Sequence, residues 1–351
     1  MFCVSRLLPR QFHVISIFYS QRAVAPADIH NSSAKCRDVN FEYLQSNPAP
    51  LPNGVSFFQR GWLSSNNVLL HDDQQAVLID SGYWTHAQQT VELVSDTLRG
   101  APLTCLLNTH LHSDHCGGNA QLQLFYPQLQ TLVPPGHANF VFDWDPSALT
   151  YTPTGQHCPK FFANGVIRSG DRVTVSNREW VAHAAPGHDP NSIVLFCEEF
   201  GLLISADALW ENGFGVVFPE IEGIDTFDEV AETLDLIESL NPKVVMPGHG
   251  GLFTDVHLAL RNARSRLTSF RQDPLKHGIY AAKVLLKFKL LELQRVDMAE
   301  FLSWAEGCDF LKLLQTRYAP ADSFQDWAQS MCNSLEKSGA ARRDGNDWVN
   351  V

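Results

Sequence analysis

The stretch that decides the fold is Thr109-His110-Leu111-His112-Ser113-Asp114-His115-Cys116-Gly117-Gly118, in which four potential metal ligands fall within six residues. It follows the apolar run 103–107 and leads into a predicted helix. In an extended or loop conformation alternate side chains point the same way, so the imidazoles of His110 and His112 can bind one ion. Asp114 and His115 leave the following turn in other directions and can serve a neighbouring ion. An isolated surface or core histidine does not explain such a cluster.

Three further potential ligands lie where an apolar run meets a loop. His188 stands in Pro-Gly-His, Asp207 follows the apolar run 202–205, and His249 follows the run 244–246 within Pro-Gly-His-Gly. Functional sites collect at such positions of layered α/β proteins. Histidine and carboxylate ligands without a thiolate suit zinc, and iron or manganese accept similar sets.

Short strands and helices alternate from about residue 50 to 270, which predicts a layered α/β domain. Residues 134–165 are aromatic- and proline-rich and fit a loop region that lines or covers a site. Thr226 and Glu229 form a predicted capping box that opens a helix. The other elements expected are strands at 55–58, 68–70, 76–80, 103–107, 130–133, 173–175, 180–183, 192–197, 202–205 and 243–246, and helices at 86–99 and 117–125.

The chain changes character beyond residue 272. Helices are expected at 275–294, 297–306 and 322–338, followed by a hairpin at 340–349 with Asp-Gly as its turn. Three helices and a terminal hairpin describe a winged-helix module, and a helical tail packed on the main domain is the alternative. We therefore expect an N-terminal extension over 1–45, a main domain over 46–272 and a C-terminal module over 273–351.

The charge and the cysteines narrow the function and the compartment. The formal net charge of −12 repels polyanions at long range, which argues against nucleic acid as the default partner. The eight cysteines contain no CxxC pair, as expected of reduced thiols in the cytoplasm. The sequence contains no run of eighteen or more apolar residues, so we expect no membrane span. Residues 1–27 contain arginines but no Asp or Glu, which leaves a weak signal or transit peptide open beside an ordinary extension.

The sequence resembles the metallo-β-lactamase superfamily over about residues 50–255, through its HxHxDH motif followed by Gly-Gly. The resemblance implies an αββα sandwich. It also implies that His110, His112 and His188 bind a first metal ion, that Asp114, His115 and His249 bind a second, and that Asp207 bridges both. Asp80, at the end of an apolar run, resembles the family's aspartate that helps to hold the ligand loop.

Departures from particular subfamilies restrict the activity. Asp207 replaces the cysteine of the zinc β-lactamases, which argues against antibiotic hydrolysis, and His112 replaces the glutamate of flavodiiron proteins. Cys116 beside the ligands is interpreted as a packing residue. The C-terminal pattern resembles the branch of β-lactamase-like protein 2, which includes glyoxalase II-like thioesterases and a single-strand RNA endonuclease.

These features predict a dinuclear hydrolase with two Zn²⁺ per chain. A metal-bridging hydroxide would attack a small-molecule thioester, lactone or other ester, and Asp114 would orient it or pass a proton to the leaving group. Trp84 and Trp210, like Trp144 and Phe214, lie in segments expected near the rim, and the first two are candidate substrate contacts.

Three alternatives stay open at this stage. A metal-dependent single-strand nuclease would need a basic stripe, to which Lys276, Lys283, Lys287 and Lys289 on one predicted helix could contribute. A mononuclear iron dioxygenase acting on persulfides is disfavoured because the second ligand set is complete. A non-enzymatic metal-binding relic is disfavoured for the same reason.

Overall fold

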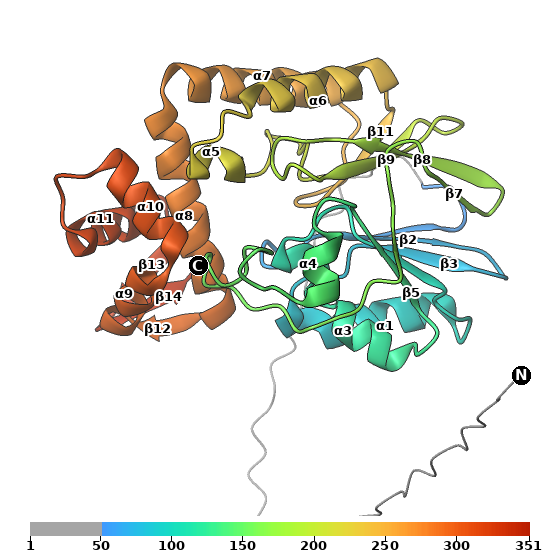
Figure 1. Cartoon of the computed structure of the whole chain (residues 1–351), viewed down its shortest axis with the longest axis horizontal. Helices are drawn as coiled ribbons and strands as arrows, with labels where there is room; N and C mark the ends of the chain where they lie inside the picture. Colours follow the sequence, from blue (N-terminus) through green and yellow to red (C-terminus); the bar gives the residue numbers. More distant parts are fainter. Residues whose placement is uncertain (1–50) are drawn as a thin grey trace, which may run out of the picture. The chain divides into compact units, whose positions relative to one another are not determined.

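The computed structural model describes residues 51–351, and two β-sheets face each other at the centre of the α/β part (Figure 1). The first has the order β1-β2-β3-β4-β5-β6, with β1 Val55–Phe58, β2 Asn67–His71, β3 Ala76–Ile79, β4 Cys105–Leu107, β5 Gln130–Val133 and β6 Gly165–Val166. The second has the order β11-β10-β9-β8-β7, with β7 Arg172–Val175, β8 Arg178–Ala184, β9 Ile193–Cys197, β10 Leu202–Ala206 and β11 Val244–Pro247. Buried aliphatic residues of both sheets, such as Ile79 and Met246, share one core cluster.

Helices cover the outer face of each sheet. On the first sheet, Val91 and Val94 of α1 (Ala87–Leu98) and Leu122 of α3 (Asn119–Phe125) pack into one cluster with strand residues. On the second, residues of α6 (Phe227–Leu240) and α7 (Val256–Gln272) pack against β9, β10 and β11. Strands β9, β10 and β11 are buried at every position, because both faces of this part of the sheet are covered. The order helix, sheet, sheet, helix confirms the αββα sandwich.

Most of the predicted strands and helices are present, together with several additional elements. The helix expected at 117–125 is α3, which begins two residues later, and the ligand motif itself forms an additional short helix, α2 (Ser113–Cys116). Helix α7 was not predicted, although its buried positions, such as Leu260 and Leu267, have helical spacing and Asp255 caps its start. The other additions are helices α4 (Ala138–Asp143), α5 (Phe218–Glu222) and α10 (Asp309–Tyr318), the 3₁₀ turn Trp84–His86, and the short strands Gly165–Val166 and Arg295–Asp297.

Four helices and a small sheet make up the C-terminal part. They are α8 (Pro274–Leu293), α9 (Met298–Gly307), α10, α11 (Phe324–Lys337) and a sheet of order β12-β14-β13, with β12 Arg295–Asp297, β13 Ala341–Asp344 and β14 Asp347–Asn350. The terminal hairpin is confirmed, but its turn is Gly345, at φ 64°, and Asn346 rather than the predicted Asp-Gly, because Asp344 is paired with Asp347 in the sheet. Val216 and Ile221, from the segment after β10, belong to the same core cluster as these helices. The boundary at residue 272 and the winged-helix assignment therefore stay predictions.

Several expectations fall partly or wholly outside the described residues. The proposed targeting segment 1–27 lies outside them, as do Cys3 and Cys36. The six cysteines within residues 51–351 are free thiols. Within the described part of the chain, no helix is long and apolar enough to cross a membrane.

The predicted capping box at Thr226 is wrong, whereas the side chain of Asp297 caps the start of α9. Asp297 accepts hydrogen bonds from the backbone N–H groups of Ala299 and Glu300. At the start of α6, the backbone N–H groups of Thr226 and Phe227 instead donate to Oε1 of Glu220, at 2.6 and 3.1 Å. Among the described residues the Thr226 hydroxyl has no hydrogen-bond partner. The carboxylate of Glu220, which lies on α5, therefore caps the start of α6 in place of the Thr226 side chain.

This difference can be tested with two variants. We expect Glu220→Ala to lower the free energy of unfolding by about 1–2 kcal/mol, because it leaves two helix-start N–H groups without their acceptor. We expect Thr226→Val to leave it unchanged or to raise it, since the lost hydroxyl is buried and unpaired. Urea denaturation followed by circular dichroism measures both, and a larger loss for Thr226→Val than for Glu220→Ala would contradict the assignment.

Candidate metal centre

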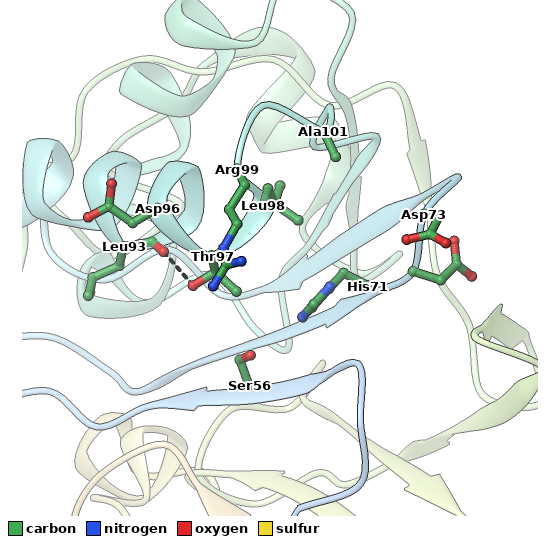
Figure 2. A pocket seen from close by; sticks show the side chains of 10 residues that line it. Ser56, His71, Asp73, Leu93, Asp96, Thr97, Leu98, Arg99 and Ala101 are labelled. Carbon is green, nitrogen blue, oxygen red and sulfur yellow. Dashed lines mark hydrogen bonds between the residues drawn. The ribbon is translucent and has the colours of Figure 1, made fainter.

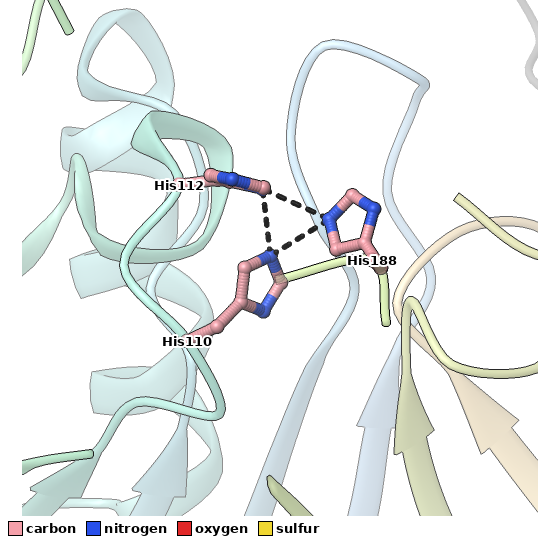
Figure 3. Close-up of side chains that lie close together, drawn as sticks. All are labelled: His110, His112 and His188. Atoms are coloured by element: carbon pink, nitrogen blue, oxygen red, sulfur yellow. Dashed lines mark hydrogen bonds between the residues drawn. The ribbon is translucent and has the colours of Figure 1, made fainter. Parts of the chain in front are cut away.

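Three imidazoles meet at the ends of strands from both sheets. His110 and His112 follow β4, and His188 lies in the loop between β8 and β9. Figure 3 shows their ring nitrogens pointing at one another. The distances are 3.1 Å from His110 Nε2 to His112 Nδ1, 2.9 Å from His112 Nδ1 to His188 Nε2, and 3.2 Å between the Nε2 atoms of His188 and His110.

A second cluster lies beside the first and consists of Asp114, His115, Asp207 and His249, whose ligand atoms all lie within 4.8 Å of one another. Asp207 faces both clusters. Its Oδ1 is 3.4 Å from His115 Nε2, and its Oδ2 is 3.4 Å from His188 Nε2. Asp114 Oδ2 is 3.0 Å from His249 Nε2. The seven residues that the sequence singled out are therefore brought together.

The carboxylate of Asp80 holds the loop that carries the motif. Its Oδ1 accepts a hydrogen bond from the backbone N–H of Thr109 at 2.9 Å, and its Oδ2 accepts one from the Thr109 hydroxyl at 2.7 Å. The same Oδ2 lies 2.7 Å from His115 Nδ1. Because Nδ1 of His115 is engaged in this way, its Nε2 is left to face the second cluster.

His188 is oriented from the opposite side. Its Nδ1–H donates to the carbonyl oxygen of Val216 at 2.5 Å, so Nε2 points at the other two imidazoles. The next backbone N–H, that of Val217, donates to Nε2 of His277 on α8 at 3.2 Å. Burial lowers the pKa of His277 to about 4, which keeps this imidazole a neutral acceptor. The C-terminal part of the chain thus supports the loop that orients a site histidine.

Burial and neighbouring charges set the protonation of the clusters. Burial and the adjacent imidazoles lower the pKa of His110 well below its ordinary value, and that of His112 to about 4. Burial alone would raise the pKa of Asp207, but His249 and His115 hold it below its usual range. Burial likewise opposes the charged form of His115, yet the carboxylates of Asp80, Asp207 and Asp114 raise its pKa. Metal ions bind neutral imidazoles and ionised carboxylates, so the first cluster already holds neutral imidazoles, whereas an ion in the second cluster would displace a proton from His115.

Two glycines are required by the close approach of site side chains. A Cβ at Gly248 would lie 2.2 Å from Asp207 Oδ1 and 3.0 Å from His115 Cε1. A Cβ at Gly215 would lie 2.4 Å from His188 Nδ1. The backbone itself therefore forms part of the wall behind the clusters.

A cavity opens over both clusters, which we call the site cavity. Trp210 lines it, and its indole N–H donates to Asp207 Oδ1 at 3.2 Å. Trp84 is not among the lining residues and packs instead against Tyr83 and His157. Trp144 and Phe214 lie in core clusters. The roles of Trp84 and Trp210 as substrate contacts stay predictions.

Many of the residues that line the site cavity were not predicted from the sequence. Trp62 is 58% exposed, and its ring stacks on that of His249 at 5.4 Å between centroids. Helix α8 and Phe218 supply further apolar lining. From the segment 134–165, which was expected to lie near a site, Thr150, Thr154 and Gln156 reach the cavity. Among residues 51–351, the lining consists of Trp62, His112, Asp114, Thr150, Thr154, Gln156, His188, Asp207, Trp210, Gly215, Val216, Phe218, His249, Tyr280, Val284, Leu285 and Phe288.

A second hollow, between the end of α1 and the turn after β2, shares no residue with the site cavity (Figure 2). Its polar groups serve local structure. Asp72 accepts hydrogen bonds from the backbone N–H groups of Gln74, Gln75 and Ser176, which lower its pKa. The hydroxyl of Thr97 donates to the carbonyl of Leu93 at 2.8 Å.

Two facing sheets between helices, with histidine and aspartate clusters at the strand ends, define a metal-binding α/β protein of four layers. Residues 60–249 match the family model of the metallo-beta-lactamase superfamily, and the chain belongs to that superfamily as a metal-dependent hydrolase.

Curated relatives and solved structures agree with this assignment. The chain is 28% identical over 220 residues to a hydroxyacylglutathione hydrolase of Haemophilus ducreyi, covering 59% of this chain and 80% of the relative. It is 24% identical over 226 residues to an acyl-coenzyme A thioesterase of Homo sapiens, covering 58% and 80%. A beta-lactamase domain protein from Burkholderia ambifaria has a TM-score of 0.53 at 23% identity, covering 79% of this chain and 92% of its own, and shares the fold.

Adding one methyl group behind the clusters tests the geometry. We expect Gly248→Ala to lower zinc affinity by about 10- to 100-fold, because the new Cβ displaces Asp207 and His115. Gly251→Ala is the matched control, since its Cβ would meet only the side chain of Gln59, at 3.8 Å. Competition with a chromophoric chelator measures the affinity, and equal affinities for the two variants would refute the prediction.

Proposed function

We propose that the protein is a dinuclear zinc-dependent hydrolase that cleaves a small-molecule thioester. In this proposal His110, His112 and His188 hold one ion, Asp114, His115 and His249 hold the other, and Asp207 contacts both. The observation that carries it is the placement of Asp207, whose carboxylate lies 3.4 Å from His115 Nε2 in one cluster and 3.4 Å from His188 Nε2 in the other. Lactones and other activated esters present the same kind of carbonyl and are the alternative substrates.

The donor set fits zinc. A tetrahedral zinc ion with Zn–N distances of about 2.0–2.1 Å requires its nitrogens to lie about 3.3 Å apart. The three nitrogens of the first cluster are 2.9–3.2 Å apart. In the second cluster, His115 Nε2 is buried and has no hydrogen-bond partner among the described residues. A buried polar atom of this kind is costly unless an ion satisfies it, which supports a second metal.

The chain's own residues would position the reactants. When bound, the metal ions lower the pKa of a water molecule toward neutrality and polarise the scissile carbonyl. Asp114, whose side chain is 14% exposed and lines the site cavity, is proposed to orient the attacking water and to pass a proton to the leaving sulfur. The aromatic lining excludes bulk water from the reacting carbonyl.

The alternatives receive less support. The thioester activities named for the hydroxyacylglutathione hydrolase and the acyl-coenzyme A thioesterase favour thioesters here. A nuclease would need free cations, yet Lys287 donates to Ala340 and Asn350, and Lys289 pairs with Glu292. The complete second cluster disfavours a mononuclear iron dioxygenase.

Metal analysis and substrate turnover test the proposal together. We expect about two zinc ions per chain and hydrolysis of S-lactoylglutathione or acyl thioesters. Asp207→Ala should lower kcat/KM by at least about 100-fold, because it removes the contact between the two metal sites. Removal of the metals by a chelator should lower the Tm, and added zinc should restore it.

Three results would contradict the proposal. One iron per chain with oxygen consumption would favour the dioxygenase, and cleavage of a single-stranded RNA oligonucleotide without ester turnover would favour the nuclease. Full activity of Asp207→Ala would remove the dinuclear assignment itself.

A further inference from the structure

We propose that the wall of the site cavity built by helix α8 binds an apolar acyl chain, so that the enzyme selects thioesters by the length of their acyl group. The inference rests on the proposed function and names its substrate class. The juxtaposition that carries it is that of Tyr280, Val284 and Phe288 on α8 with the two clusters, across one cavity.

The lining contains no cation outside the clusters. Every ionisable acid or imidazole in it belongs to the two clusters, and within residues 51–351 no lysine or arginine lines it. The rest is aromatic or aliphatic apart from glycine, Thr150, Thr154 and Gln156. A glutathione moiety carries two carboxylates, which require cationic or N–H partners when they are buried. The lining offers a buried carboxylate no cationic side chain, whereas a hydrocarbon chain needs none, so the group that enters the cavity is expected to be apolar.

Helix α8 presents an ordered apolar face to the cavity. Tyr280, Val284 and Phe288 are spaced four residues apart and so lie along one side of the helix. Leu285, beside them, is 2% exposed. The ring of Phe288 packs edge-on against Tyr83 at 5.1 Å, and the ring of Tyr280 stacks on Phe270 at 5.9 Å. Because these rings are packed from behind, the wall is formed before substrate arrives.

The polarity of the cavity orients the substrate. Phe218 lies 4.5 Å from the ring of His112, which continues the apolar surface up to the first cluster. The α8 wall is buried, with Phe288 only 9% exposed, whereas Trp62 beside His249 is 58% exposed. An apolar acyl chain gains most by entering the buried side, and a polar thiol carrier stays hydrated at the exposed side. Selection by acyl length thus depends on residues beyond the matched range 60–249.

The experiment uses the full-length, zinc-loaded protein and a series of S-acyl N-acetylcysteamine thioesters from acetyl to dodecanoyl. The thiol is neutral and constant, so the series reports on the acyl group alone. We expect kcat/KM to rise by about two- to fourfold per methylene until the cavity is filled. S-lactoylglutathione should be a poorer substrate than the octanoyl thioester.

Two substitutions at one half-buried position test the wall. Val284→Phe should lower the ratio of octanoyl to acetyl kcat/KM by at least about tenfold, and Val284→Ala should move the optimum to longer chains. Leu275→Phe is the matched control, because Leu275 is on the same helix, is 43% exposed and does not line the cavity. The control should keep the wild-type ratio, and zinc content verifies that each variant is folded.

The outcomes separate this inference from the proposed function. Thioester turnover with a flat dependence on acyl length, or a Val284→Phe ratio equal to that of the control, would overturn the acyl-chain wall and leave the hydrolase intact. Preference for S-lactoylglutathione would overturn it in the same way. Absence of turnover on every thioester, with two zinc ions bound, would overturn the proposed function and this inference together.

Discussion

The contact of one carboxylate, that of Asp207, with two groups of imidazoles is the interaction on which the rest of the structure depends. Asp207 follows β10 in the second sheet, whereas His115 belongs to the segment after β4 in the first. Oδ1 of Asp207 lies 3.4 Å from His115 Nε2, and Oδ2 of Asp207 lies 3.4 Å from His188 Nε2. This contact can form only if the two sheets face each other with these strand ends at the same edge, which is the arrangement observed.

Burying these carboxylates and imidazoles is electrostatically unfavourable for folding. A cluster of buried carboxylates and imidazoles loses hydration on folding, and such groups are tolerated when they pair with one another or bind metal ions. Asp80 already satisfies Nδ1 of His115, and Val216 satisfies Nδ1 of His188. Nε2 of His115 then faces Asp207, and Nε2 of His188 faces His110 and His112. Metal binding and folding are therefore expected to be coupled in this protein.

The C-terminal helices contribute residues to the site itself. Helix α8 contributes His277, which holds the segment that orients His188, and it contributes the apolar wall of the site cavity. The core cluster that contains Val216 and Ile221 extends into these helices. A change in α8 can therefore affect metal binding and substrate selection through different residues.

The family resemblance supplied the αββα order, and the sequence by itself determined a layered α/β domain, most of its strands, several of its helices, the terminal hairpin and the seven residues that meet in the clusters. These features depend on local patterns: apolar runs, helical spacing and a dense ligand motif. Only the tertiary structure decided that Glu220 caps α6, that Trp210 rather than Trp84 lines the cavity, and that α8 forms its wall. The reason is physical, because these contacts join surfaces far apart in the chain, and local spacing does not specify which surfaces pack together.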